Sequence, residues 1–323
     1  MNTLGKLIKG LLRFPISVVV YAYFVCKFRN VDFMHYRELA DVRFCAPKFL
    51  GSVFLYGNYK AISKLTHRRF NFFKDYCEHG VCFSDNPESA KLLGYVDRRG
   101  IRRVYTFSQR RKKALETFLK TRKSKAEVIA VGPYILGVSH FLSKEKFNRL
   151  KGKLGKTLLV FPTHTIETNT DSYRVDRLNV SVEQKRKDFE TIMVCMYWND
   201  VLHQSRMIEY YERNGYVVVS AGHRNDPKFL NRLRDIILLA DVVMLNSVGT
   251  NLGYSVALKK LVWFVDREDE ARHEAFADPC LQELAENVQR LNEKCVGLFP
   301  VGGECITAEQ IDFVENYWGK NED

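Results

Sequence analysis

The second half of the sequence alternates short apolar runs with amphipathic stretches of helical length. The apolar runs are residues 156–164, 191–198, 216–223, 241–247 and 261–265, and charged segments with helical periodicity separate them. Strands that are connected through helices pair in parallel within one sheet. Five such strands with four crossovers predict a doubly wound, Rossmann-like lobe.

The first half carries a shorter version of the same alternation. We expect strands within residues 51–57, 70–80, 101–108 and 127–136, with Ser108 as the N-cap of a helix over residues 109–120. A chain of 323 residues is long enough for two domains with separate cores. The predicted organisation is a basic apolar segment at 1–29, an N-terminal lobe at 30–150, a C-terminal lobe at 151–265, and closing helices at 266–323 that pack back across the first lobe.

The net charge of +12 is distributed unevenly along the chain. Residues 1–156 carry a net +21, residues 157–265 carry +1, and residues 266–323 carry −10. Such a field attracts nucleic acid, an anionic membrane or phosphorylated substrates. The sequence has no nucleic-acid-binding motif, and its basic residues lie in one lobe without interleaved stacking aromatics, so we expect no nucleic acid as a partner.

The first 29 residues have two interpretations. Basic residues flank an apolar run at 14–26 that is too short to span a bilayer. The segment is typical of a helix that lies in the lipid interface, and equally of a buried first helix or strand of the N-terminal lobe. A second group of basic residues is predicted to share a membrane-facing surface with it: Arg98, Arg99, Arg102, Arg103, Arg110, Arg111, Lys112 and Lys113.

The eight cysteines have no regular spacing, and no secretory cleavage site follows the apolar run. This pattern favours a reducing cytoplasm, with the protein peripheral on the inner face of the cell membrane. Cys77, His79 and Cys82 form a single cluster without a second ligand pair, so we expect no metal site there.

Polar residues follow four of the predicted C-lobe strands. In an open parallel sheet, ligands bind beyond the carboxyl ends of the strands, which makes these positions candidate binding residues. They are Thr163, His164 and Thr165; Tyr197, Trp198 and Asn199; Gly222, His223 and Arg224; and Asn246, Ser247, Gly249 and Thr250. The last group opens a helix, where free amides and the helix dipole suit a phosphate. A helix start that binds no ligand is the alternative.

The segment SVGTNLGYSVALKKLVWFV at 247–265 resembles the donor-binding segment of GT-B glycosyltransferases. The turn at 132–134 and the run at 158–167 are also similar to that superfamily, the latter to enzymes of lipopolysaccharide and capsule assembly. The resemblance covers about residues 70–265, although the E-x-x-x-x-x-x-E signature is missing. It implies two Rossmann-like lobes with a cleft between them, in which the N-terminal lobe at 30–150 binds the acceptor and the C-terminal lobe at 151–265 binds the nucleotide sugar. It also implies that Asn246, Ser247, Gly249 and Thr250 hold the diphosphate of a nucleotide sugar, which is a substrate and not a cofactor.

The resemblance also implies a catalytic histidine in the N-terminal lobe. His79 with Gly80 is similar to the His-Gly step of polyol-phosphate transferases and related enzymes, where the histidine is the candidate base. Glu78 and Asp85 are the alternatives. Imidazole and guanidinium groups at His164, His223 and Arg224, together with Thr165, would bind the donor and neutralise the departing diphosphate. The chain has no D-x-D triplet, so transfer is expected to need no metal.

The sequence thus predicts a glycosyltransferase that uses a nucleotide sugar and a glycan or lipid-linked acceptor in cell-surface polysaccharide synthesis. A phosphopolyol transferase or a nucleotide-sugar epimerase is the alternative, because both use the same two-lobed fold.

Overall fold

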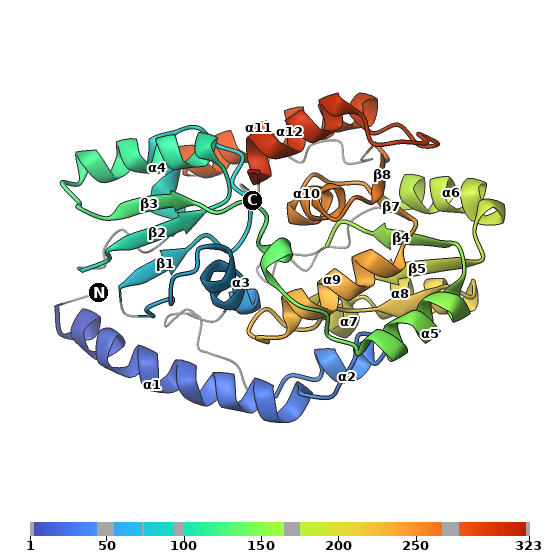
Figure 1. Cartoon of the computed structure of the whole chain (residues 1–323), viewed down its shortest axis with the longest axis horizontal. Coiled ribbons are helices and arrows are strands. Elements are labelled where there is room, and N and C mark those ends of the chain that lie inside the picture. The colour runs from blue at the N-terminus through green and yellow to red at the C-terminus, as the bar shows by residue number, and fades with distance from the viewer. Residues whose placement is uncertain are drawn as a thin grey trace.

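The chain folds into two α/β lobes, each around its own parallel sheet (Figure 1). The computed structural model describes residues 3–43, 55–72, 74–93, 100–164, 175–266 and 278–320. The predicted fold class, α/β with two Rossmann-like lobes, is confirmed.

The first lobe holds a three-stranded sheet in the order β1-β2-β3. Its strands are β1 (Asp75–Cys77), β2 (Arg103–Thr106) and β3 (Glu127–Ala130). Its helices are α3 (Asn58–Leu65) and α4 (Gln109–Thr121), with 3-10 helices η1 (Leu55–Gly57), η2 (Pro87–Leu93) and η3 (Tyr134–Gly137). The predicted N-cap of α4 is confirmed, because the Ser108 hydroxyl accepts a hydrogen bond from the Arg111 amide at 3.3 Å.

The second lobe holds a five-stranded parallel sheet, as its sequence pattern predicted, and the strand order is β6-β5-β4-β7-β8. The strands are β4 (Thr157–Phe161), β5 (Thr191–Cys195), β6 (Val217–Val219), β7 (Val242–Leu245) and β8 (Leu261–Phe264). The helices and the 3-10 helix of this part are α5 (Lys144–Leu154), α6 (Asp176–Lys185), η4 (Arg186–Asp188), α7 (Trp198–His203), α8 (Ser205–Arg213), α9 (Phe229–Leu239) and α10 (Thr250–Ala257). Every residue of the central strand β4 is buried, as expected for a strand covered on both faces.

Two C-terminal helices connect the lobes: α11 (Pro279–Leu298) and α12 (Ala308–Trp318). The Glu283 carboxylate of α11 accepts hydrogen bonds from Ser84 at 2.9 Å and Asn86 at 2.6 Å, both in the first lobe. At the end of α12, the buried Trp318 lies 5.4 Å from the ring of Phe83 and fills the space beside Gly253 of α10. Both helices therefore contact the first lobe, α11 through Glu283 and α12 through Trp318.

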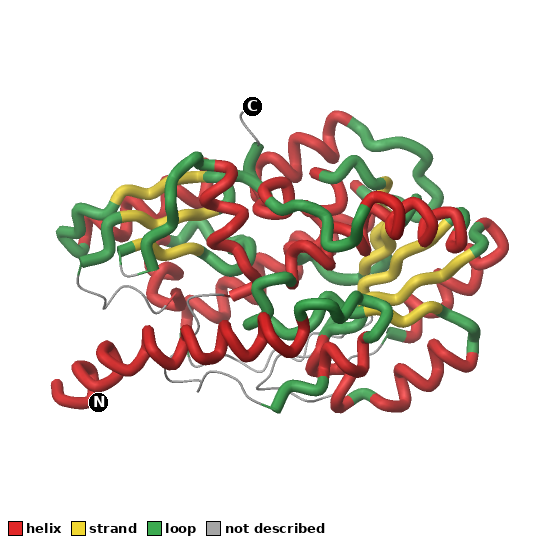
Figure 2. The backbone as a smooth tube through the Cα atoms, turned by 60° about the horizontal axis from the view of Figure 1, so that its bottom comes forward, coloured by secondary structure: helices red, strands yellow, loops and turns green. Residues whose placement is uncertain are grey.

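The N-terminal segment is a helix, α1 (Thr3–Phe28), followed by the short α2 (Tyr36–Ala40). It lies along the underside of the molecule, as Figure 2 shows. The Tyr59 hydroxyl of α3 donates to Tyr21 at 3.3 Å, whereas Phe24 stacks on His223 of the second lobe at 5.0 Å. The helix thus contacts both lobes and does not belong to the first alone. Among the described residues, no helix combines the length and apolar character needed to cross a bilayer.

One predicted strand is wrong. Of residues 51–57, the last three form η1, and the others lie outside the described residues. Tyr56 and Gly57 have φ of 56° and 75°, which a strand does not allow. A Cβ atom on Gly57 would lie 2.5 Å from the Pro227 oxygen, so this glycine permits close contact with the second lobe.

Candidate functional site

The segment that follows β1 in the first lobe contacts the segment that follows β7 in the second lobe. The segment after β1 lies against the start of α10, where the Val81 amide donates to the Thr250 hydroxyl at 3.4 Å. A Cβ atom on Gly80 would lie 3.3 Å from the same hydroxyl oxygen. Two segments were indicated by the resemblance to GT-B glycosyltransferases: His79–Gly80 and the turn before α10. These two segments are therefore neighbours in space.

The first turn of α10 leaves amides available. Gly249 is its N-cap, in extended backbone and without a side-chain cap. Within the described residues, the amides of Gly249, Thr250 and Asn251 have no hydrogen-bond acceptor. A Cβ atom on Gly249 would meet no atom within 4 Å. Open space beside unpaired amides at a helix N-terminus is suited to an anion, and no side chain caps the helix in its place.

The turn before α10 is held in position by two neighbouring segments. The Asn246 side-chain oxygen accepts hydrogen bonds from the Thr163 amide at 2.8 Å and its hydroxyl at 3.0 Å. The Val248 amide donates to Asn292 of α11 at 2.7 Å. Asn246 is also buried, so this predicted binding residue fixes the loop and does not point into open space. Ser247 is partly exposed.

His79 is exposed after β1, and its ring lies nearly parallel to that of Tyr56 at 6.3 Å between centroids. The surrounding protein desolvates the imidazolium form and the positive Arg224 lies nearby, and both effects lower the pKa of His79. A neutral imidazole that is still accessible to a ligand can accept a proton near pH 7.

His223 lies in a different environment although it also follows a strand. It is 2% exposed, between Phe24 and Trp198, whose ring is 4.2 Å away. Its Nδ1 accepts a hydrogen bond from the Asn225 amide at 3.1 Å. Burial, and to a lesser extent Arg224, lower its pKa to about 3. A buried neutral ring cannot offer positive charge to a diphosphate, so the role predicted for His223 is corrected to a packing role.

The two carboxylates proposed as alternatives to His79 are held by arginines. Glu78 is 1% exposed, and its side chain accepts hydrogen bonds from Thr106 and from Arg111, the latter at 2.9 Å. Burial in an ion pair makes Glu78 a structural group and removes it from the candidate bases. Asp85 is exposed and forms an ion pair with Arg110.

Of the remaining predicted binding residues, the structure describes His164 and Arg224 but not Thr165. His164 is exposed, and its ring lies 4.6 Å from that of Tyr197. Thr165 lies outside the described residues. Arg224 is half-buried, and its carbonyl accepts a hydrogen bond from the Tyr56 amide.

The predicted basic surface is smaller than the sequence indicated. Arg111 is buried against Glu78, and Arg103 forms an ion pair with the buried Asp75 at 2.7 Å. Arg98 and Arg99 lie outside the described residues. Arg111 is therefore corrected to an internal residue, because a carboxylate at 1% exposure requires a buried partner.

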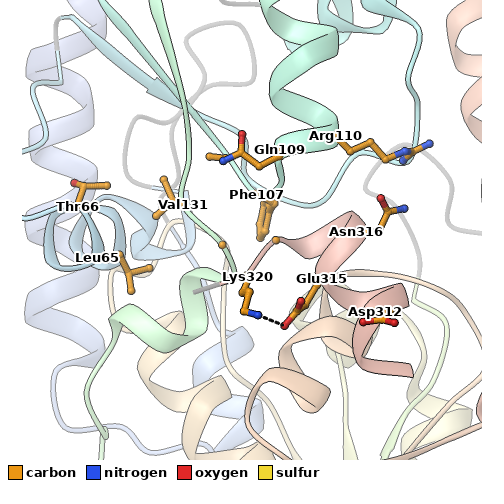
Figure 3. Close-up of a pocket in the computed structure, with 13 residues that line it drawn as sticks. Leu65, Thr66, Phe107, Gln109, Arg110, Val131, Asp312, Glu315, Asn316 and Lys320 are labelled. Atoms are coloured by element: carbon orange, nitrogen blue, oxygen red, sulfur yellow. Dashed lines mark ion pairs between the residues drawn. The ribbon is translucent and has the colours of Figure 1, made fainter. Parts of the chain in front are cut away.

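A cavity of about 450 Å³ lies at the carboxyl edge of the first-lobe sheet (Figure 3). The residues that line it come from α3, from the segments after β2 and β3, and from α12: Leu65, Thr66, Phe107, Gln109, Arg110, Ala130, Val131, Gly132, Asp312, Glu315, Asn316, Gly319 and Lys320. Of these residues, the sequence analysis singled out Gly132, in the predicted turn, and Arg110, in the predicted basic surface. Nothing in the sequence indicated that α12 forms one wall of this cavity.

Comparisons with known proteins give weak structural likenesses only. No protein-family profile and no curated protein sequence matches the chain. HepE of Anabaena, solved in complex with UDP-glucose, is 13% identical, with 74% of this chain and 70% of that one covered and a TM-score of 0.31. The wall teichoic acid polymerase TagF is 9% identical, with 95% and 93% covered and a TM-score of 0.27. At such scores neither likeness carries an inference about the site.

Proposed function

We propose that this protein is a glycosyltransferase that moves a sugar from a nucleotide-sugar donor to a glycan or lipid-linked acceptor in cell-surface polysaccharide synthesis. The observation that carries the proposal is the contact of Gly80 and Val81, which directly follow His79, with Thr250 at the open N-terminus of α10 across the two lobes. It brings a candidate base to a candidate anion site, which are the two elements that such a transfer needs.

The donor diphosphate would lie at the first turn of α10. The amides of Gly249, Thr250 and Asn251 can donate to phosphate oxygens, and the helix dipole favours the negative charge. Arg224 lies close enough to His79 to influence its pKa, so its guanidinium is near the same edge. Its positive charge would stabilise the nucleoside diphosphate as that group departs.

His79 would act as the general base. The acceptor hydroxyl oxygen forms a bond to the anomeric carbon while the bond from that carbon to the phosphate oxygen breaks. The hydroxyl proton passes to the neutral imidazole of His79, and the electron pair leaves with the nucleoside diphosphate. The lowered pKa of His79 keeps its ring largely in the neutral form near pH 7, which is the form that can accept the proton.

The cell-surface acceptor and the membrane location rest on sequence resemblance and charge. The strongly basic first half supports attraction to an anionic leaflet. On α1, the side chains of Val18 and Val19 are exposed to solvent at 42% and 56%. These valines could enter the interface of an anionic membrane, where apolar side chains add to electrostatic attraction.

A nucleotide screen tests the proposal. The melting temperature of the full chain is measured with nucleoside mono- and diphosphates and with nucleotide sugars, since a ligand that binds only the folded state raises it. We expect stabilisation by a nucleoside diphosphate and its sugar conjugates, and release of the diphosphate when acceptor glycan is added. Chelator should leave most of the transfer rate intact. Absence of binding by every nucleotide would refute the proposal, and product analysis separates sugar transfer from epimerisation or phosphopolyol transfer.

A further inference from the structure

The cavity at the first-lobe edge is separate from the candidate donor site. None of the residues that line it belongs to the group His79, Arg224, Gly249 and Thr250. Its volume of about 450 Å³ is comparable with that of small-molecule binding sites. It also lies beyond the ends of β2 and β3, which is where parallel sheets bind ligands.

Opposite walls of the cavity have complementary hydrogen-bonding character (Figure 3). The start of α4 forms one wall, where the amides of Gln109 and Arg110 have no acceptor among the described residues and the Gln109 side chain is exposed. Helix α12 forms the other, with the acceptor oxygens of Asp312, Glu315 and Asn316. One wall therefore donates mainly, and the other mainly accepts.

The charges around the cavity disfavour an anion. Arg110 is already paired with Asp85, and Lys320 lies 3.8 Å from the carboxylate of Glu315. Asp312 adds a carboxylate for which no ion pair is found among the described residues. A phosphate in the cavity would therefore be repelled by the acidic groups of α12. The two basic side chains that could offset this repulsion already form ion pairs.

A neutral ligand with many hydroxyl groups fits these walls. Each hydroxyl donates one hydrogen bond and accepts others, so it can connect the α4 wall to the α12 wall. The half-buried Leu65 and the buried Val131 add an apolar patch that can contact the C–H groups of a sugar ring. Saccharides combine these two properties.

We propose that this cavity binds a saccharide and serves as a subsite for a sugar of the acceptor that lies away from the reacting hydroxyl. The assignment to the acceptor rests on the proposed function, whereas saccharide binding itself requires no nucleotide. Binding energy from such a remote sugar can be used to orient the reacting group.

Ligand-observed NMR on the full chain without nucleotide tests the proposal. The probes are glucose, galactose, N-acetylglucosamine and their disaccharides, with glycerol phosphate as the anionic comparison. We expect binding of at least one saccharide and none of glycerol phosphate. The double variant Gln109→Ala and Asn316→Ala should weaken saccharide binding by about ten-fold or more, because two hydrogen bonds are lost. Both side chains are exposed, so folding should be preserved.

The matched control is Glu309→Ala, an exposed residue of α12 that does not line the cavity. It should bind saccharide as the unmodified chain does. Absence of binding for every saccharide, equal binding by the double variant, or preferential binding of glycerol phosphate would each overturn the proposal. Nucleotide binding is measured separately. If the unmodified chain binds saccharide but no nucleotide, the proposed donor site is contradicted and the saccharide site is still supported.

Discussion

The segments after β1 and β6 both end a parallel strand with a histidine near Arg224, yet they give those histidines opposite environments. His79 is exposed, and the residues that follow it contact the start of α10, whereas His223 is buried under α1. The pKa of each is lowered, first by desolvation and then by Arg224. Position after a strand therefore places a residue at the ligand-binding edge, but the elements that pack over that edge decide whether it can contact a ligand.

The largest expected effect is on turnover, which should depend on His79 because this is the histidine that a ligand can contact. His79→Ala should lower turnover by roughly 10²- to 10⁴-fold, the usual contribution of a positioned base, with donor affinity little changed. The control is His35→Ala, whose side chain is 63% exposed and lies far along the chain from both loops. Steady-state kinetics on folded protein measures the effect. Near-normal turnover of the His79 variant would transfer the role to Asp85 or remove it.

The pH profile sharpens the same prediction. Because the folded pKa of His79 lies below its ordinary value of 6.5, the neutral form of the ring predominates at pH 6.5 and above. The acidic limb of kcat/KM should therefore fall below pH 6.5 and disappear with His79→Ala.

The next effect concerns the open space at α10. Gly249→Asp places a carboxylate beside the free amides, where it competes with and repels a diphosphate, and should weaken nucleoside diphosphate binding by about 100-fold or more. Thr250→Ala should weaken it by roughly ten- to a hundred-fold through loss of a charge-assisted hydrogen bond. Nucleoside without phosphate should bind both variants as it binds the unmodified chain.

Calorimetry makes this measurement, with Gly152→Asp as control. Gly152 is exposed in α5, and a Cβ atom there also meets nothing within 4 Å. Equal diphosphate binding by the Gly249 and Gly152 variants would place the donor elsewhere.

A smaller effect is expected at His223, and it concerns stability. The unfolded chain protonates this histidine near pH 6.5 but the folded chain only at about 3, so the unfolded state gains protons first as the pH falls. The contribution of His223 to stability is therefore complete above pH 6.5 and is lost progressively down to about pH 3.

His223→Phe isolates that contribution. It keeps an aromatic ring against Phe24 but leaves the Asn225 amide without its acceptor, at a cost of about 1–3 kcal/mol near pH 8. Denaturant unfolding from pH 8 to 4 should show a weaker decline in stability for this variant. An unchanged decline would mean that other groups cause the acid sensitivity.

The smallest effect concerns the exposed side chains of Val18 and Val19 on α1. Val18→Asp with Val19→Asp should reduce co-sedimentation with anionic vesicles several-fold, and added salt should release the unmodified chain in part. Uncharged vesicles provide the control. If the unmodified chain stays in solution with anionic vesicles at low salt, the membrane proposal fails.

The strand and helix order was predictable because it depends on local periodicity and on the rules of parallel connections. The five strands of the second lobe and the Ser108 cap follow from such local patterns. The error at 55–57 has another origin, since Gly57 combines a left-handed φ with a close approach to Pro227, which lies far along the chain.

The site was predictable only in part, for the same reason. The strand-end rule indicated the segments at His79 and Thr250 separately, and only the resemblance to a two-lobed fold implied that the ends of the two sheets face each other. The burial of Glu78 with Arg111 and of His223 under Phe24 depends on tertiary packing that a sequence pattern does not contain. The α12 wall of the cavity is a long-range feature of the same kind.

The contacts that the end of α12 makes with both lobes limit how the lobes can move when a substrate binds. Trp318 occupies the space beside Gly253 of one lobe, and a Cβ atom on Gly319 would lie 2.1 Å from the Phe107 oxygen of the other. Helix α1 makes a second bridge through Tyr21 and Phe24. Two bodies connected at several separated points lose most of their freedom to swing apart. We therefore expect a bulky donor to enter without a large change in the angle between the lobes.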